Sequence, residues 1–143
     1  MILQDVENLL GGNKYLNVKL RTRMDLIDLT HRGVTKSALN YFIKYMDISQ
    51  KQMASLLNIT PRTIQKLKPK DLFKPGVSEQ ILKLAEVFAK GIDVFGDKRT
   101  FKLWLEQPNV ALGRKIPIDL LDTRYGSDMV LDILGRIEHG IYS

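Results

Sequence analysis

The stretch from residue 49 to residue 65, SQKQMASLLNITPRTIQ, decides the fold of the N-terminal half. Ser49 is a favoured helix N-cap, and Met53, Ala54 and Leu57 recur at the spacing of one helix face, which predicts a helix over 50–57. Asn58 follows, and asparagine adopts a positive φ more readily than any residue except glycine. A tight turn after this helix is therefore expected.

A second short helix is predicted directly after the turn. Thr60 is a favoured N-cap, and Pro61 occupies the first helical position, where a missing N–H costs nothing. Pro69 disfavours helical geometry at Lys68 and so limits the length of this helix. Two short helices joined by a tight turn have the spacing of a helix-turn-helix.

Charge is segregated along the chain. Between residues 51 and 75 there are six basic residues and one acidic residue, whereas residues 119–143 contain five acidic residues and two arginines. A basic cluster centred on a helix-turn-helix can neutralise phosphates and release their counterions, so its binding depends steeply on salt. The alternative is that these lysines only solvate a helix face.

The geometry of the motif assigns roles to the polar residues of both helices. The N-terminal residues of the second helix face base edges, and the first helix crosses the DNA backbone. Arginine can pair with guanine and glutamine with adenine, while Gln50 and Lys51 are better placed for phosphates. The candidate DNA-binding residues are Gln50, Lys51, Thr60, Arg62, Thr63, Gln65 and Lys66. We expect Ile64 and Leu67 to belong to the core.

The rest of the chain also predicts helices, because apolar positions recur at three and four residues throughout. Residues 1–20 are compatible with a short helix or a strand-like arm that ends at Gly11-Gly12. Two of the expected helices have both ends: 24–30, which stops before Gly33, and 78–95. Four others are placed by where they begin: after Thr35, after the cap Asp97, at Pro117 for a brief helix, and at about Ser127. The predicted fold class is all-α, with a boundary between halves near residues 74–77.

Composition excludes several functional classes. Leu, Ile, Val and Phe make up 47 of 143 residues, enough apolar surface for a folded domain, and the formal charge is +6. The longest stretch without a charged residue has ten residues, whereas a membrane span needs roughly twenty. No secretory signal is expected, because no basic region precedes an apolar one at the N-terminus. We therefore expect no membrane partner.

Catalytic and metal-binding chemistry is also disfavoured. The chain has no cysteine, which excludes disulfides and thiolate sites and fits a reducing compartment such as the cytoplasm. His31 and His139 lie in unrelated patterns, and no Gly-rich phosphate loop is present. We expect a binding protein that is not an enzyme and has no cofactor or metal site.

Two regions together resemble the Xre/MbcA/ParS family of bacterial antitoxins, the partners of RES-domain toxins. Residues 26–33 and 49–65 are similar to the Xre-like DNA-binding half of that family. The second region is the stronger: VFGD at 94–97, WL at 104–105, PN at 108–109, ALG at 111–113, DLLDT at 119–123 and LGRIE at 134–138. The chain departs from the family pattern at Asn58, where glycine is usual, at Lys66-Leu67, and at Val110 and Arg114.

The resemblance implies a helical antitoxin with a 24–75 helix-turn-helix half packed to a 76–143 toxin-binding half, preceded by an extension over 1–23. It also implies a homodimer within a larger toxin–antitoxin complex. The first half would bind operator DNA and repress the antitoxin's own operon. The second would hold a RES-domain toxin that consumes NAD and would cover the route to its active site.

The toxin-binding candidates follow the apolar face of the last helix: Arg136, Glu138, His139, Tyr142 and Ser143. Weakly constrained polar residues near a terminus can enter a cleft at little folding cost. The alternative is that Arg136 and Glu138 are solvated and Tyr142 packs on its own domain. A second functional hypothesis also stays open: a stand-alone helix-turn-helix regulator whose C-terminal half only dimerises.

Overall fold

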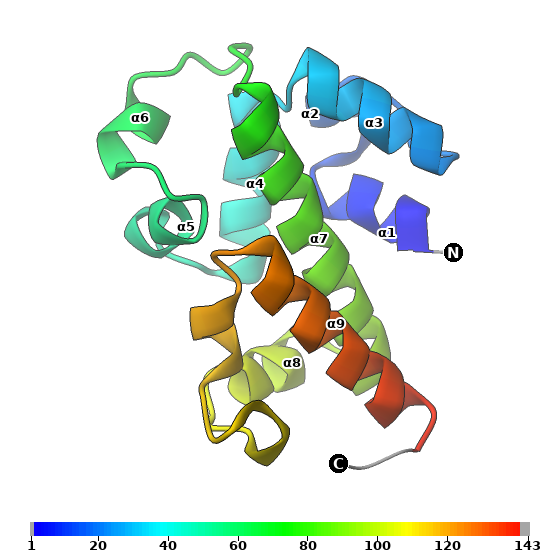
Figure 1. The fold of residues 1–143 in the computed structure, drawn as a ribbon. Coiled ribbons are helices and arrows are strands. Elements are labelled where there is room, and N and C mark those ends of the chain that lie inside the picture. The colour runs from blue at the N-terminus through cyan, green and yellow to red at the C-terminus, as the bar shows by residue number, and fades with distance from the viewer. Residues whose placement is uncertain (1, 141–143) are drawn as a thin grey trace. The chain divides into compact units, whose positions relative to one another are not determined.

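The computed structural model describes residues 2–140, and these are mostly helical, which confirms the all-α prediction (Figure 1). Isolated bridges pair Thr35 with Leu72 and Asn109 with Lys115. The described residues 2–140 contain no strand. The helices are α1 (Ile2–Leu9), α2 (Gly12–Leu16), α3 (Arg23–Arg32), α4 (Lys36–Met46), α5 (Gln50–Leu56), α6 (Pro61–Gln65), α7 (Pro75–Phe95), α8 (Lys98–Leu105) and α9 (Arg124–Glu138). Two 3₁₀ turns, η1 (Val110–Leu112) and η2 (Pro117–Leu120), precede α9.

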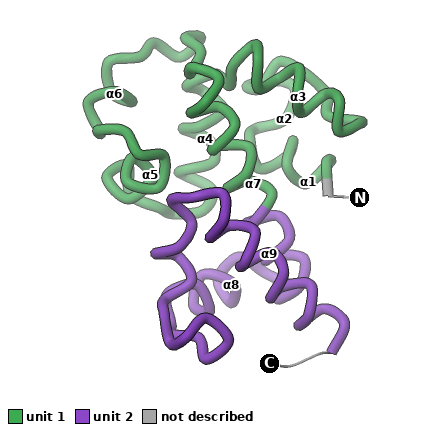
Figure 2. The backbone as a smooth tube through the Cα atoms, in the orientation of Figure 1, with its two compact units in different colours: residues 1–86 green, residues 87–143 purple. Residues whose placement is uncertain are grey.

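The chain divides into two compact units, residues 1–86 and 87–143 (Figure 2). The division falls inside α7, which begins at Pro75, within the stretch 74–77 near which the sequence suggested a boundary between halves. Pro75 occupies the first helical position and Gly76 the second, so these two residues open a helix here. None of the helices in the described range is long and apolar enough to cross a bilayer.

Within the N-terminal segment, residues 2–9 and 12–16 form helices, so the helical alternative is the correct one, and both helices belong to the first unit. Helices α1 and α2 pack on each other and on α4. The carboxylate of the buried Glu7 accepts a hydrogen bond from the backbone N–H of Leu20 at 2.7 Å. The Thr35 hydroxyl donates to the Tyr15 carbonyl at 2.7 Å, and the rings of Tyr15 and Tyr41 stack at 5.7 Å. These contacts make the N-terminal segment a layer of the first unit.

Side-chain caps begin most helices of the first unit. Thr22 and Asp25 form a capping box at α3, and Thr35 caps α4 through the Ala38 N–H. Ser49 and Thr60 cap α5 and α6, as the sequence predicts. Each such cap contributes typically about 1 kcal/mol, so the local sequence alone sets these helix starts.

The core of the first unit contains a polar link at Ser78. This serine is fully buried on α7 and accepts a hydrogen bond from the Val34 N–H at 2.9 Å, while its own hydroxyl donates to the Phe73 carbonyl at 3.1 Å. The link joins the end of α3 to the residues before α7. The apolar core of the same unit includes the fully buried side chains of Phe42, Met46, Met53, Ile64 and Ile81.

The second unit is built on aromatic packing. Phe101 of α8 is fully buried and contacts Phe88, Phe95 and Trp104 at ring-centroid distances of 5.5, 6.0 and 6.1 Å. A Cβ on Gly91 would lie 2.2 Å from the Phe101 ring, so a glycine is required at this close approach. Thr123 caps α9 by accepting from the Gly126 N–H, which gives this threonine a structural role.

Candidate functional site

The helix-turn-helix consists of α5, a turn at Asn58 and α6. Asn58 has φ 58°, in the left-handed region expected for this turn. The Ile59 N–H donates to the Ala54 carbonyl at 3.0 Å, which brings the chain back toward α5. Helices α5 and α6 pack together, with Met53, Ala54 and Ile64 buried, while Leu67 is only half-buried.

The candidate DNA-binding residues lie on the surface, and some of them have hydrogen-bond partners within the motif. Lys51, Thr60, Arg62, Gln65 and Lys66 are exposed, and Gln50 and Thr63 are half-buried. Gln65 Nε2 donates to Gln50 Oε1 at 3.0 Å, so the last residue of α6 is joined to the first residue of α5. The Thr60 and Thr63 hydroxyls lie 3.0 Å apart at the start of α6. Two of the candidates, Thr60 and Gln65, therefore also shape the motif.

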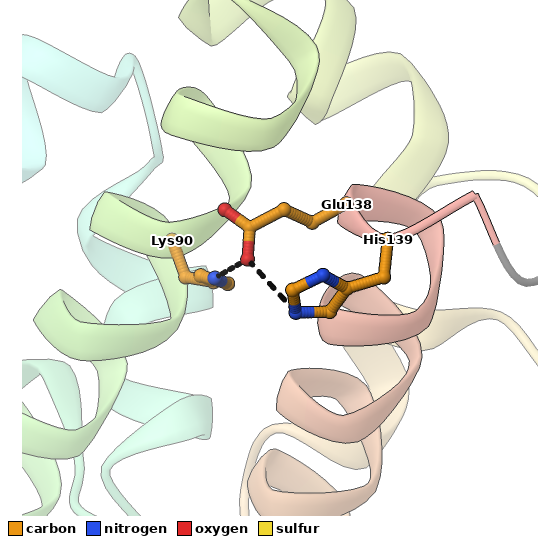
Figure 3. A network of polar contacts seen from close by, with 3 residues as sticks. All are labelled: Lys90, Glu138 and His139. Atoms are coloured by element: carbon orange, nitrogen blue, oxygen red, sulfur yellow. Dashed lines mark hydrogen bonds and ion pairs between the residues drawn. The ribbon is translucent and has the colours of Figure 1, made fainter.

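Two of the candidates near the end of α9, Glu138 and His139, lie in one polar cluster with Lys90. Glu138 Oε1 is 2.5 Å from Lys90 Nζ on α7 and 3.9 Å from His139 Nε2 (Figure 3). The hydrogen bond from Lys90 holds the pKa of the Glu138 carboxyl below its ordinary value of 4.5, against an opposing effect of burial. Arg136 pairs with Asp132 one turn earlier in α9, at 3.0 Å. Tyr142 and Ser143 lie outside the described residues.

Two family models match consecutive parts of the chain. Residues 25–86 match the antitoxin Xre-like helix-turn-helix domain, and residues 90–140 match the antitoxin Xre/MbcA/ParS C-terminal toxin-binding domain. An Antitoxin Xre from Yersinia enterocolitica is 29% identical over 120 residues, covering 82% of this chain and 81% of the relative. A Prs ADP-ribosylating antitoxin from Sphingobium sp. is 32% identical over 130 residues, covering 84% of this chain and 82% of the relative. The chain belongs to the Xre/MbcA/ParS family of antitoxins.

The antitoxin also shares its fold with a chain of the M. tuberculosis MbcT–MbcA toxin–antitoxin complex. The TM-score is 0.57 at 18% identity, and the match covers 76% of the antitoxin and 96% of that chain. The two domain matches meet within α7, between residues 86 and 90, close to the division between the two compact units. This antitoxin therefore combines a helix-turn-helix domain with a family toxin-binding domain.

Two lysines of the antitoxin that its sequence does not nominate contact candidate site residues or the end of α6. Lys36, the first residue of α4, donates from Nζ to the carbonyls of Gln65 and Leu67 at 3.2 and 2.5 Å, and so caps the end of α6. Lys90 holds Glu138. The sequence separation is 29 residues for Lys36 and Gln65 and 48 residues for Lys90 and Glu138. No local pattern could have found these pairs.

Two positions at which the sequence departs from the family pattern share one loop of the second unit. Asn109 closes this loop, since its N–H donates to the Lys115 carbonyl at 3.0 Å and its side chain accepts from the Ala111 N–H at 2.8 Å. Val110 is 78% exposed, and Arg114 has φ 67°. A left-handed arginine costs about 1 kcal/mol or more, which the closing hydrogen bonds offset.

Proposed function

We propose that this antitoxin binds and neutralises a RES-domain toxin by covering the route to its NAD-consuming active site. The observation that carries the proposal is the pair of domain matches on one chain, at 25–86 and 90–140. The Sphingobium relative is named a Prs ADP-ribosylating antitoxin, and transfer of ADP-ribose consumes NAD. That name connects a relative of this chain with NAD chemistry, and in our proposal the NAD-consuming activity belongs to the toxin, while the antitoxin acts by binding.

The toxin-binding surface in this proposal is the end of α9 and the residues that follow it. Arg136, Glu138 and His139 supply charged and polar groups there, and Tyr142 and Ser143 complete the set. His139 has a side chain that is 73% exposed, and Arg136 is 47% exposed. The active-site cleft of an NAD-consuming toxin is polar because it binds a charged nucleotide. Exposed groups of both charge signs on the antitoxin would complement such a cleft.

The second part of the proposal is autorepression by a homodimer in the cytoplasm. The polar and basic residues of the helix-turn-helix, with Arg62 and Lys66 at α6 and Gln50 and Lys51 at the start of α5, bind operator DNA. Three further lysines, all exposed after α6, add phosphate contacts: Lys68, Lys70 and Lys74. A symmetric dimer would read two half-sites one helical turn apart.

Co-expression with a RES-domain toxin, for which the product of the neighbouring gene is the first candidate, tests the first part. We expect wild-type antitoxin to restore growth and to abolish NAD loss in extracts, and an Arg136→Glu, His139→Glu double variant to restore neither. Arg62→Ala serves as the control, because it should weaken operator binding by roughly 1–3 kcal/mol while growth is still restored. Cells that die despite wild-type antitoxin would contradict the proposal.

A stand-alone regulator whose C-terminal half only dimerises makes a different prediction. In that case light scattering would show a dimer, but the RES-domain protein would not co-purify with the antitoxin. Salt titration separates the two surfaces: operator affinity should fall steeply between about 50 and 200 mM salt, with the slope of several released counterions, while toxin affinity falls less. Equal slopes would argue against separate DNA and toxin surfaces.

A further inference from the structure

The last turn of α9 contains few buried groups of its own. Ile133 and Leu134 are buried, but beyond Leu134 every described residue is half-buried or exposed. Apolar packing therefore holds α9 as far as Leu134 and contributes little after it. A helix end with so little burial frays unless another interaction restrains it.

The Lys90–Glu138 pair supplies that restraint. Glu138 is the last residue of α9, and Figure 3 shows its side chain beside that of Lys90 on α7. Lys90 lies on the part of α7 that belongs to the same unit as α9. The side chains of Lys90 and Glu138 are only 23% and 35% exposed, so water screens their attraction less than it screens an open surface pair. The pair joins the end of one helix to the side of another.

The position of Glu138 is otherwise unfavourable. A carboxylate at a helix C-terminus lies beside the negative end of the helix dipole, which disfavours it. The Lys90 ammonium offsets this cost, and His139 in its protonated form would strengthen the offset. By contrast, the Arg136–Asp132 pair lies within α9 at a four-residue separation and joins α9 to no other element.

We propose that Glu138 serves toxin binding as a positioning residue: through Lys90 it fixes the last turn of α9 in the second unit, so that Arg136 and His139 are presented in one place. Glu138 itself makes no toxin contact. This inference rests on the proposed function and refines it, since it removes one residue from the contact set and adds Lys90 to the residues on which affinity depends.

Charge exchange tests the inference. We compare Lys90→Glu, Glu138→Lys and the double variant, which restores an ion pair of reversed polarity. The readouts are affinity for the purified RES-domain toxin, thermal midpoint, and hydrogen exchange of amides 134–140 in the free antitoxin. Each single variant should weaken toxin binding roughly threefold to tenfold and speed exchange at the end of α9, because it places two like charges together. The double variant should return the toxin affinity and the hydrogen-exchange rate to within about twofold of wild type.

Lys83→Glu is the matched control. Lys83 also lies on α7, and it pairs with Glu86 at 3.8 Å, three residues later in the same helix. Lys83→Glu therefore makes the same change of charge as Lys90→Glu, but the pair that it disrupts lies within α7. The Lys83→Glu variant should bind the toxin with wild-type affinity, and its amides 134–140 should exchange hydrogen at the wild-type rate. An unchanged thermal midpoint in Glu138→Lys, together with weaker toxin binding, separates positioning from general stability.

The outcomes distinguish the two proposals. If wild-type antitoxin fails to bind the toxin, the proposed function and the positioning role fall together. If wild type binds and the double variant stays as weak as Glu138→Lys, Glu138 contacts the toxin directly and only the positioning role is overturned. Toxin binding by Lys90→Glu as tight as that of wild type would overturn the positioning role as well.

Discussion

Gln65, the last residue of α6, donates a hydrogen bond of 3.0 Å to the side-chain oxygen of Gln50, the first residue of α5. The bond uses the Gln50 side-chain oxygen as acceptor and does not use the Gln50 amide N–H groups. A side chain fixed in this way has less conformational entropy to lose when it donates to a DNA phosphate. Gln65 then acts through Gln50, although its residue type alone suits adenine recognition.

The first prediction separates these two roles of Gln65. Gln65→Ala should weaken binding to operator and to random duplex by the same factor, about threefold to tenfold, because a phosphate contact carries no sequence information. Fluorescence anisotropy on operator variants with single base-pair changes measures this. Arg62→Ala is the control that should relax the preference at one base pair. A loss of adenine preference in Gln65→Ala would show that Gln65 reads a base.

Lys36→Met should loosen the end of α6. The substitution keeps the apolar stem but removes the ammonium that donates to the Gln65 and Leu67 carbonyls. We expect the free energy of unfolding to fall by about 0.5–1.5 kcal/mol in urea titrations, and operator affinity to fall with it. Lys44→Met, at an exposed position on the same helix, removes the same charge and should change stability little. Equal effects of the two variants would show that only net charge matters.

Ser78→Ala tests the buried link between the end of α3 and the start of α7. The alanine leaves the Val34 N–H buried without its acceptor, which should lower the free energy of unfolding by roughly 1–3 kcal/mol. Urea denaturation followed by circular dichroism measures the change. Ser55→Ala, at an exposed position of α5, is the matched control and should stay close to wild type. A wild-type midpoint for Ser78→Ala would contradict the assignment.

Gly91→Ala should destabilise the second unit. A new Cβ would lie 2.2 Å from the Phe101 ring, so the aromatic cluster must shift, at a cost of roughly 1–3 kcal/mol. Gly135→Ala on α9 is the control, because nothing lies within 4 Å of its added Cβ and alanine is a better helix former by about 1 kcal/mol. We expect thermal shifts of opposite sign for the two variants, and a shift of the same sign would contradict the close approach at Gly91.

Acid should destabilise the antitoxin partly through Asp97, the N-cap of α8. The Thr100 backbone N–H donates to Asp97 Oδ1 at 2.7 Å, and this bond lowers the pKa of the carboxyl below its ordinary value of 3.8. A lowered pKa in the folded state contributes stability that is complete above the ordinary value and is lost as the pH falls through the folded-state pKa. Unfolding free energy should therefore decline below about pH 4.

Asp97→Asn provides the test of that assignment. Asparagine can still cap the helix through its oxygen but does not titrate, so its stability should depend less on pH between about 4 and 2 than that of wild type. Urea midpoints at a series of pH values give the two curves. Parallel curves would show that Asp97 does not contribute to the acid transition.

The sequence by itself determined the local structure of this antitoxin. The caps at Thr35, Ser49, Thr60 and Asp97, and the left-handed turn at Asn58, depend on neighbours within a few residues, so residue type predicts them. The resemblance to the antitoxin family likewise rests on motifs that can be read along the chain, and the domain matches confirm it.

Tertiary structure decided what those residues touch. Helices α1 and α2 pack on α4, and Lys36 and Lys90 reach partners 29 and 48 residues away. Burial and long-range hydrogen bonds depend on which segments the fold brings together, and no short window of sequence contains that information. For this reason the sequence could nominate Glu138 and Gln65 as binding residues, but only the folded chain showed that each already holds a partner inside the protein.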